Sequence, residues 1–215
     1  LLPINATLAN YEDLFLKEDF LNNIKNSLIV ASASTFVSVT FSCMAAYSLV
    51  RLRYRFRTWI GRLILFTYLT PSALLFIPLS VMVARLQLSN TQHGLIFVYL
   101  TFAAPLSTWL LMGYFRGIPK DLEEQAMVDG ATRFQAFYRI TIPLAVPGLI
   151  AVSVFTFTAA WNELLLALIF ITSPDLQTVP VSISYLITGD VFRFGLIMAA
   201  SVSAAVPVMV LYYLA

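Results

Sequence analysis

The sequence predicts an all-α, polytopic membrane protein. Hydrophobic residues make up 60% of its 215 residues and charged residues only 11%, which is far from the composition of a soluble domain. Five apolar stretches are each long enough to cross a bilayer, which takes about 20 helical residues. They cover roughly residues 27–50, 60–83, 94–115, 147–171 and 194–214. We therefore expect one transmembrane domain over residues 27–215, preceded by an external lead-in over residues 1–26.

Basic residues are distributed unevenly among the loops between these stretches. Of the 13 Lys and Arg residues, five lie in residues 51–62 and four in 116–143, whereas 1–26, 84–93 and 173–193 share the other four. Loops rich in Lys and Arg stay in the cytoplasm. The alternation of Arg with aromatic residues at 51–57 is therefore interpreted as a topology signal, and we expect no nucleic-acid partner.

Two external segments are predicted to stay outside the hydrocarbon layer. Residues 1–26 alternate charged side chains with Leu, Phe and Tyr, which indicates an amphipathic segment at the membrane surface; a solvated linker is the alternative. Residues 173–189 contain an apolar core at 179–187 that is too short to span a bilayer. We expect this second segment to be a re-entrant or surface element.

The second and fourth spans contain candidate pathway residues. Pro71 and Pro78 interrupt the second span and mark either a kink that lines a pathway or a kink of packing alone. Asn162 and Glu163 lie in the fourth span, and a carboxylate at membrane depth usually faces a bundle interior or a water-filled cavity. Glu163 is therefore expected either near the pathway or its gate, or as a residue that caps or braces a helix contact with a partner subunit.

The polar stretch between the third and fourth spans predicts a helical hairpin. It reads LEEQAMVDGATRFQAFYRITIP over residues 122–143. Asp121 with Glu124, and Thr132 with Gln135, have the spacing of capping boxes that each open a helix. Gly130 stands where a left-handed residue would end the first helix.

The second helix of this hairpin is predicted to have one apolar face. Phe134, Phe137 and Tyr138 are spaced at i, i+3 and i+4. Pro143 and Pro147 are expected to end the helix and to mark the return to the membrane. We expect a loop so well capped to bind a partner.

Missing motifs exclude several classes of enzyme. The sequence contains no G-x-x-x-x-G-K-[ST], so it cannot bind ATP through a P-loop. Its one histidine, His93, has no nearby carboxylate or cysteine, and its one cysteine, Cys43, excludes intrachain disulfides and cysteine-based metal sites. Glu163 has no second carboxylate at membrane depth. We therefore expect no catalytic residue, no metal and no cofactor on this chain.

The hairpin resembles the EAA loop of permease subunits of ATP-driven (ABC) importers. The pattern E-x-A-x-x-D-G-A, followed by I-x-I-P, is formed by Glu124, Ala126, Asp129, Gly130, Ala131, Ile140, Ile142 and Pro143. Gln125 departs from it, because the family usually has alanine there. Residues 115–119 (Phe-Arg-Gly-Ile-Pro) and Trp161-Asn162-Glu163 look like the maltose-type carbohydrate branch. The resemblance covers nearly the whole chain.

The resemblance implies the type I ABC importer permease fold, with five spans here and a sixth expected before them. It implies that the hairpin at 118–143 couples to the ATPase through Leu122, Glu124, Ala126, Asp129, Gly130, Ala131, Phe134 and Phe137. It also implies a bacterial inner-membrane carbohydrate importer. Its partners would be a second homologous permease forming a heterodimer, two ATP-binding subunits, a periplasmic or lipid-anchored solute-binding protein, and membrane lipid.

Two alternatives stay open at this point. The same architecture could carry an amino acid, a polyamine or phosphate, and a membrane scaffold without transport belongs to a different class. The capped hairpin disfavours the scaffold, because a scaffold has no need of such an element.

Overall fold

The computed structural model describes residues 7–188 and 191–215, and nearly all of them are helical. The elements that position the site are α1 (Ala9–Lys17), α2 (Phe20–Arg51), α3 (Arg57–Leu69), η1 (Ser72–Leu75), α4 (Phe76–Arg85), α5 (Gln92–Gly117), α6 (Asp121–Val128), α7 (Arg133–Ala136), the π-helical η2 (Phe137–Thr141), α8 (Ile142–Trp161), α9 (Leu165–Phe170), η3 (Pro174–Leu176), α10 (Val179–Tyr185) and α11 (Phe194–Leu214). A two-residue pair of strands, β1 (Ile187–Thr188) and β2 (Val191–Phe192), is the exception to the helices. The predicted all-α polytopic class is confirmed.

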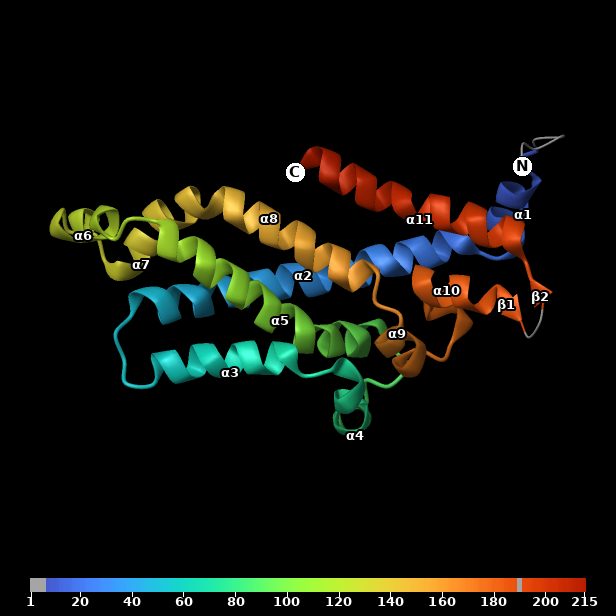
Figure 1. Cartoon of the computed structure of the whole chain (residues 1–215), viewed down its shortest axis with the longest axis horizontal. Helices are drawn as coiled ribbons and strands as arrows, with labels where there is room; N and C mark the ends of the chain where they lie inside the picture. The colour runs from blue at the N-terminus through green and yellow to red at the C-terminus, as the bar shows by residue number, and fades with distance from the viewer. Residues whose placement is uncertain (1–6, 189–190) are drawn as a thin grey trace.

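Three long helices, α2, α5 and α8, pack side by side as the centre of the bundle (Figure 1). Small side chains on α2, such as Ser34 and Ala46, are fully buried and allow the helices to approach closely. Ser42 Oγ donates a 2.9 Å hydrogen bond to the Ala104 carbonyl of α5, and Ser107 Oγ lies 2.8 Å from Thr156 Oγ1 of α8. Small residues and buried hydroxyl bonds therefore hold the three helices together.

Four unbroken helical segments are long and apolar enough to span a membrane: α2, α5, Arg133–Trp161 and α11. The second predicted span is broken, because Arg57–Leu69 and Ala73–Arg85 meet at an angle of 93°. The break falls at Thr70-Pro71, where Thr70 has an extended backbone at φ −73° and ψ 124°. Proline has no N–H to donate and disfavours helical geometry in the residue before it. The pair counts as a fifth span only if the bend lies within the membrane.

The hairpin and the fourth span differ from prediction in how they join. Pro143 and Pro147 do not end the second hairpin helix, because the chain stays helical from Arg133 to Trp161. The Ile142 N–H bonds to the Phe137 carbonyl, five residues back. A single π turn therefore joins the hairpin helix to α8 immediately before Pro143. The fourth span also ends at Trp161 and not at residue 171, and α9 follows after a short break.

The two Arg- and Lys-rich loops lie at one end of the molecule, which we call the basic end. It contains the α2–α3 loop and the α6–α7 hairpin, whereas α1, α10 and the strand pair lie at the opposite end (Figure 1). This arrangement agrees with the predicted topology, although the side of the membrane stays a prediction.

The described part of the lead-in, residues 7–26, is packed and not a solvated linker, and residues 1–6 lie outside the described residues. Its Leu14 is completely buried, α1 lies against α11, and Arg193 Nη1 pairs with Glu18 Oε1 at 2.6 Å. Leu16 on the other side of α1 is 83% exposed, so the helix is amphipathic as predicted. The helix of the first span begins at Phe20, earlier than the predicted residue 27.

Candidate functional site

The turn between α6 and α7 has the predicted left-handed glycine. Gly130 has a φ of +92°. The Ala131 N–H bonds to the Ala126 carbonyl at 2.9 Å, and the Gly130 N–H bonds to the Met127 carbonyl at 3.2 Å. These two bonds form a Schellman motif, which satisfies the last carbonyls of α6 and fixes the direction in which the chain leaves.

One of the two predicted capping boxes is present. Gln135 N donates to Thr132 Oγ1 at 3.3 Å and Thr132 N donates to Gln135 Oε1 at 2.8 Å, so α7 opens as predicted. The box of Asp121 and Glu124 is wrong, because the N-cap of α6 is Lys120 and Asp121 already lies inside the helix. Both acidic residues lie in the first turn, where they interact favourably with the helix dipole.

A buried carboxylate anchors the hairpin to the bundle. Glu123 Oε1 accepts hydrogen bonds from Arg51 Nε at 2.7 Å and from Thr141 Oγ1 at 2.8 Å, and Glu123 Oε2 accepts one from Tyr47 Oη at 2.9 Å. The side chains of Arg51 and Glu123 are only 3% and 6% exposed. Arg51 Nη2 also donates to the Ile118 carbonyl at 2.8 Å. One carboxylate therefore joins α6 to the end of α2 and to η2.

Sequence reasoning missed Glu123, Tyr47, Arg51 and Thr141. Glu123 stands beside Glu124 in the same acidic turn, and nothing in the local pattern says which of the two faces inward. The available signal was Arg51 at the end of the first apolar stretch, since an Arg at the edge of a span needs a partner when it is buried. The pairing itself depends on how distant segments pack.

The three aromatic residues of the second hairpin helix do not share one environment. Phe137 is buried against Tyr47, with ring centroids 4.4 Å apart, and belongs to the anchor. Phe134 and Tyr138 are 69% and 66% exposed. On α6, Leu122 is partly exposed and Val128 is 88% exposed. The hairpin therefore presents apolar side chains outward at the tip of the basic end.

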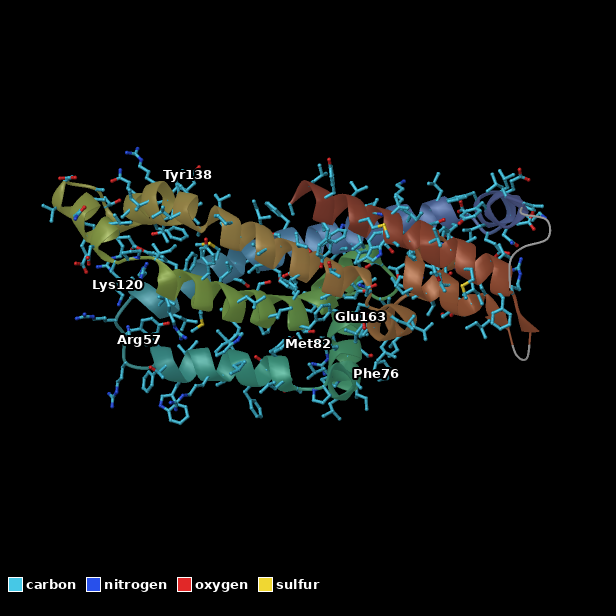
Figure 2. All side chains as sticks on the ribbon, turned by 45° about the horizontal axis from the view of Figure 1, so that its top comes forward. Arg57, Phe76, Met82, Lys120, Tyr138 and Glu163 are labelled. Atoms are coloured by element: carbon cyan, nitrogen blue, oxygen red, sulfur yellow. The ribbon has the colours of Figure 1, made fainter. Side chains whose placement is uncertain are left out.

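The remaining predicted coupling residues lie around this apolar surface. Glu124 and Asp129 are exposed on α6 and its C-cap, whereas Ala126 and Ala131 are half-buried next to the turn. The structure thus brings the predicted coupling residues into one hairpin. Figure 2 shows Lys120 and Tyr138 at this end of the molecule and Glu163 in the other half.

Glu163 caps a helix that starts within the bundle. Its carboxylate oxygens accept hydrogen bonds from Leu166 N, at 3.0 Å, and from Ala167 N, at 3.1 Å. These are the free N–H groups in the first turn of α9, so the carboxylate compensates for the break after Trp161. Glu163 therefore braces a helix of its own chain.

Asn162, next to Glu163, lies beside a hollow of about 600 Å³ between α8, α10 and α11. Trp161 and Pro180 also line this hollow. Pro71 lies at the 93° bend, and Pro78 lies in the first turn of α4. Contact with a solute stays a prediction for all four pathway candidates.

The fold and the hairpin define a class: a multi-pass helical membrane protein with a helical hairpin anchored at one end of its bundle. A family model described as "Binding-protein-dependent transport system inner membrane component" matches residues 38–215. The chain belongs to this family. It is accordingly a multi-pass inner-membrane transport subunit of the ABC type and not itself an enzyme, as the resemblance implied.

Curated relatives match the chain over almost its whole length. The inner membrane ABC transporter permease protein YcjP of Escherichia coli (strain K12) is 38% identical over 100% of this chain and 77% of the relative. The trehalose/maltose transport system permease protein MalG of Thermococcus litoralis is 35% identical, over 98% of this chain and 77% of the relative.

A solved structure shares the fold. A chain of a bacterial ABC transporter involved in the import of the acidic polysaccharide alginate superposes with a TM-score of 0.81 at 21% identity, over 100% of this chain and 80% of that chain. The same kind of transporter is also known in complex with an alginate pentasaccharide-bound periplasmic protein.

Proposed function

We propose that this chain forms half of the translocation pathway of a carbohydrate importer. The names of its relatives support the carbohydrate class: they include permeases for trehalose/maltose, trehalose, sulfoquinovosyl glycerol and diacetylchitobiose, each 31–37% identical to this chain. In the proposed assembly the chain pairs with a second, homologous permease. Two ATP-binding subunits lie below the pair, and a periplasmic or lipid-anchored solute-binding protein delivers the carbohydrate from above.

The α6–α7 hairpin is the element that would receive the ATPase. It carries the exposed apolar side chains of Leu122, Val128, Phe134 and Tyr138 together with the exposed acidic residues Glu124 and Asp129. An apolar centre with a polar rim is the usual composition of a protein interface. Hydrolysis of ATP would take place on the partner subunits, and no cofactor is proposed for this chain.

The observation that carries the coupling proposal is that the hairpin is connected to the helix bundle in two ways. Glu123 ties α6 to Arg51 and Tyr47 of α2. The second arm of the hairpin is continuous with α8, and Thr141 of η2 bonds to the same carboxylate. A displacement of the hairpin would therefore reach two of the three central helices together. Closure of an ATPase dimer is a rigid-body movement that such links can transmit.

A second candidate solute class follows from the fold. A structure of a methionine ABC transporter superposes with a TM-score of 0.76 at 15% identity. The fold therefore does not choose between sugars and amino acids, and the carbohydrate proposal rests on the sequence relatives alone.

The experiment that tests the proposal is reconstitution of the complete transporter in vesicles with its own binding protein. Uptake of labelled trehalose, maltose and methionine would be measured with ATP inside. We expect uptake of a carbohydrate that depends on both ATP and the binding protein. ATP-dependent uptake of methionine without uptake of any sugar would reject the carbohydrate assignment and leave the permease assignment standing.

A further inference from the structure

A hollow of about 500 Å³ opens at the basic end, between the last turn of α2, α3 and the last turns of α5. Five basic residues line it: Arg51, which pairs with Glu123, and Arg57, Arg62, Arg116 and Lys120. They come from two segments far apart in the sequence, which the fold places on the two sides of the hollow. Figure 2 shows Arg57 and Lys120 at the same end of the molecule.

The positive charge of four of these five basic residues is not neutralised by the chain. The lining residues include no Asp or Glu. In residues 7–188 and 191–215 the ion pairs are Lys17–Asp13, Arg51–Glu123 and Arg193–Glu18, so Arg51 is the one basic lining residue that takes part in an ion pair. Glu123 balances the charge of Arg51, and the other four charges remain.

The inner part of the same hollow is apolar. Leu65 of α3 and Trp109 and Met112 of α5 line it, and all three lie within the apolar segments assigned to the membrane. Gly61 packs directly against Met112, because a Cβ added there would lie 3.3 Å from Met112 Cε, so α3 and α5 are in contact beside the hollow. The hollow is thus charged at the end of the spans and apolar toward their middle.

The helix that forms one wall, α3, packs on α5 and α2 along one face and leaves its other face exposed. Gly61 is the buried residue of α3, whereas Trp59, Leu63 and Phe66 are 62–71% exposed. These outward residues would lie in the acyl chains of a bilayer. Beside its contact with α5, the helix borders a space that the described chain leaves unfilled.

We propose that this hollow binds one anionic phospholipid of the cytoplasmic leaflet. The phosphate of its headgroup lies among Arg62, Arg116 and Lys120, and an acyl chain lies along Trp109 and Met112. Basic pockets between spans on the cytoplasmic side bind anionic headgroups, and each Lys or Arg near the surface strengthens the attraction. The lipid would fill the space between α3 and α5 and hold α3 on the bundle.

The joint presence of charge and apolar depth distinguishes this ligand from others. A soluble phosphate would use the basic residues but not Trp109 or Met112. An ATPase subunit docked from the cytoplasm would reach Lys120 but not the apolar residues inside the spans. A phospholipid matches both parts of the hollow, and the inference does not depend on which solute is carried.

The test is lipid binding to the assembled transporter, purified with its partner permease and ATPase subunits and stripped of lipid. Native mass spectrometry would count bound dioleoyl-phosphatidylglycerol and dioleoyl-phosphatidylcholine during titration. The test variant is Arg62→Gln with Arg116→Gln. Its matched control is Arg53→Gln with Arg55→Gln, which removes the same charge from the same end outside this hollow.

We expect the tightest phosphatidylglycerol site to weaken roughly fivefold per basic residue removed, thus about 25-fold in the test variant, and to keep its affinity in the control. Arg62→Lys with Arg116→Lys should retain binding, which separates loss of charge from loss of fold. Equal binding of the two lipids, or equal weakening in test and control variants, would overturn the proposal. Competition by inorganic phosphate alone would identify a soluble-anion site instead. Release of the ATPase by the test variant at unchanged lipid binding would identify a protein interface.

Discussion

Replacing Glu123 by Gln should detach α6 from the bundle without disturbing membrane insertion. The substitution keeps the shape of the side chain and removes the charge that balances Arg51. Breaking a buried ion pair by removing one partner costs about 3–5 kcal/mol. Gln retains part of the hydrogen bonding to Thr141 and Tyr47, so we expect the lower figure of about 2–3 kcal/mol that applies to hydrogen bonds with charged groups. This corresponds to roughly a 30- to 160-fold shift toward a detached α6.

The assay combines amide hydrogen exchange with co-purification of the ATPase. Amides of α6 should exchange faster by about the same factor, whereas those of α2 and α5 keep their protection. The ATPase should be retained less well, and uptake per ATP hydrolysed should fall. Glu124→Gln is the matched control for the exchange measurement, because Glu124 is the adjacent residue in the same turn and is exposed.

A double replacement separates anchoring from charge. Replacing both partners of a buried ion pair by apolar residues is often neutral or stabilising. Arg51→Met combined with Glu123→Leu should therefore protect α6 better than either single change. The anchoring argument is refuted if the α6 amides of Glu123→Gln exchange no faster than those of Glu124→Gln.

Three further predictions follow from the turn, the capped helix and the basic loops. Gly130→Val should leave the subunit in the membrane but weaken ATPase binding or uncouple uptake from ATP hydrolysis. The reason is that a β-branched residue at φ +92° costs roughly 1–2 kcal/mol, although nothing lies within 4 Å of its Cβ. Wild-type co-purification of the ATPase and wild-type uptake in vesicles would refute the coupling assignment. Glu163→Leu should lower uptake more than Glu163→Gln, because leucine removes the acceptor of the α9 N–H groups at a cost of about 0.5–2 kcal/mol. Equal and normal uptake in both variants would show that the cap is dispensable. A reporter fused after Lys120 should be cytoplasmic and one fused near Asn90 external, and an internal Asn90 fusion would reverse the topology.

Local sequence signals were sufficient to predict the hairpin. The Thr132–Gln135 capping box and the positive φ of Gly130 each depend on residues within one turn, so spacing alone predicts them. Hydropathy likewise predicts the long helices, because their length is set by the bilayer.

Features that depend on competition between local and tertiary effects were not predicted. Pro71 breaks the second span, whereas Pro143, which follows the π turn at Phe137–Thr141, and Pro147 are accommodated in a continuous helix. Proline alone does not reveal which outcome applies, because the neighbouring hydrogen bonds decide it.

The anchor at Glu123 was beyond prediction for a related reason. Its partners come from α2 and η2, and their meeting depends on the packing of the central helices. Glu163 was predicted inside the fourth span, but that helix ends at Trp161, and Glu163 caps α9 after a break that composition does not indicate.

Site-directed cross-linking of the hairpin tip tests the central claim most directly. Cys43 is the single cysteine and is buried, so Cys43→Ala gives a background into which Val128→Cys introduces an exposed thiol. A thiol-reactive photocross-linker attached there, in membranes containing the whole transporter, should form an adduct with the ATP-binding subunit. Leu16→Cys, which is as exposed but lies at the opposite end, should form none. An ATPase adduct from Leu16→Cys, or none from Val128→Cys, would contradict the assignment of α6–α7 as the coupling hairpin.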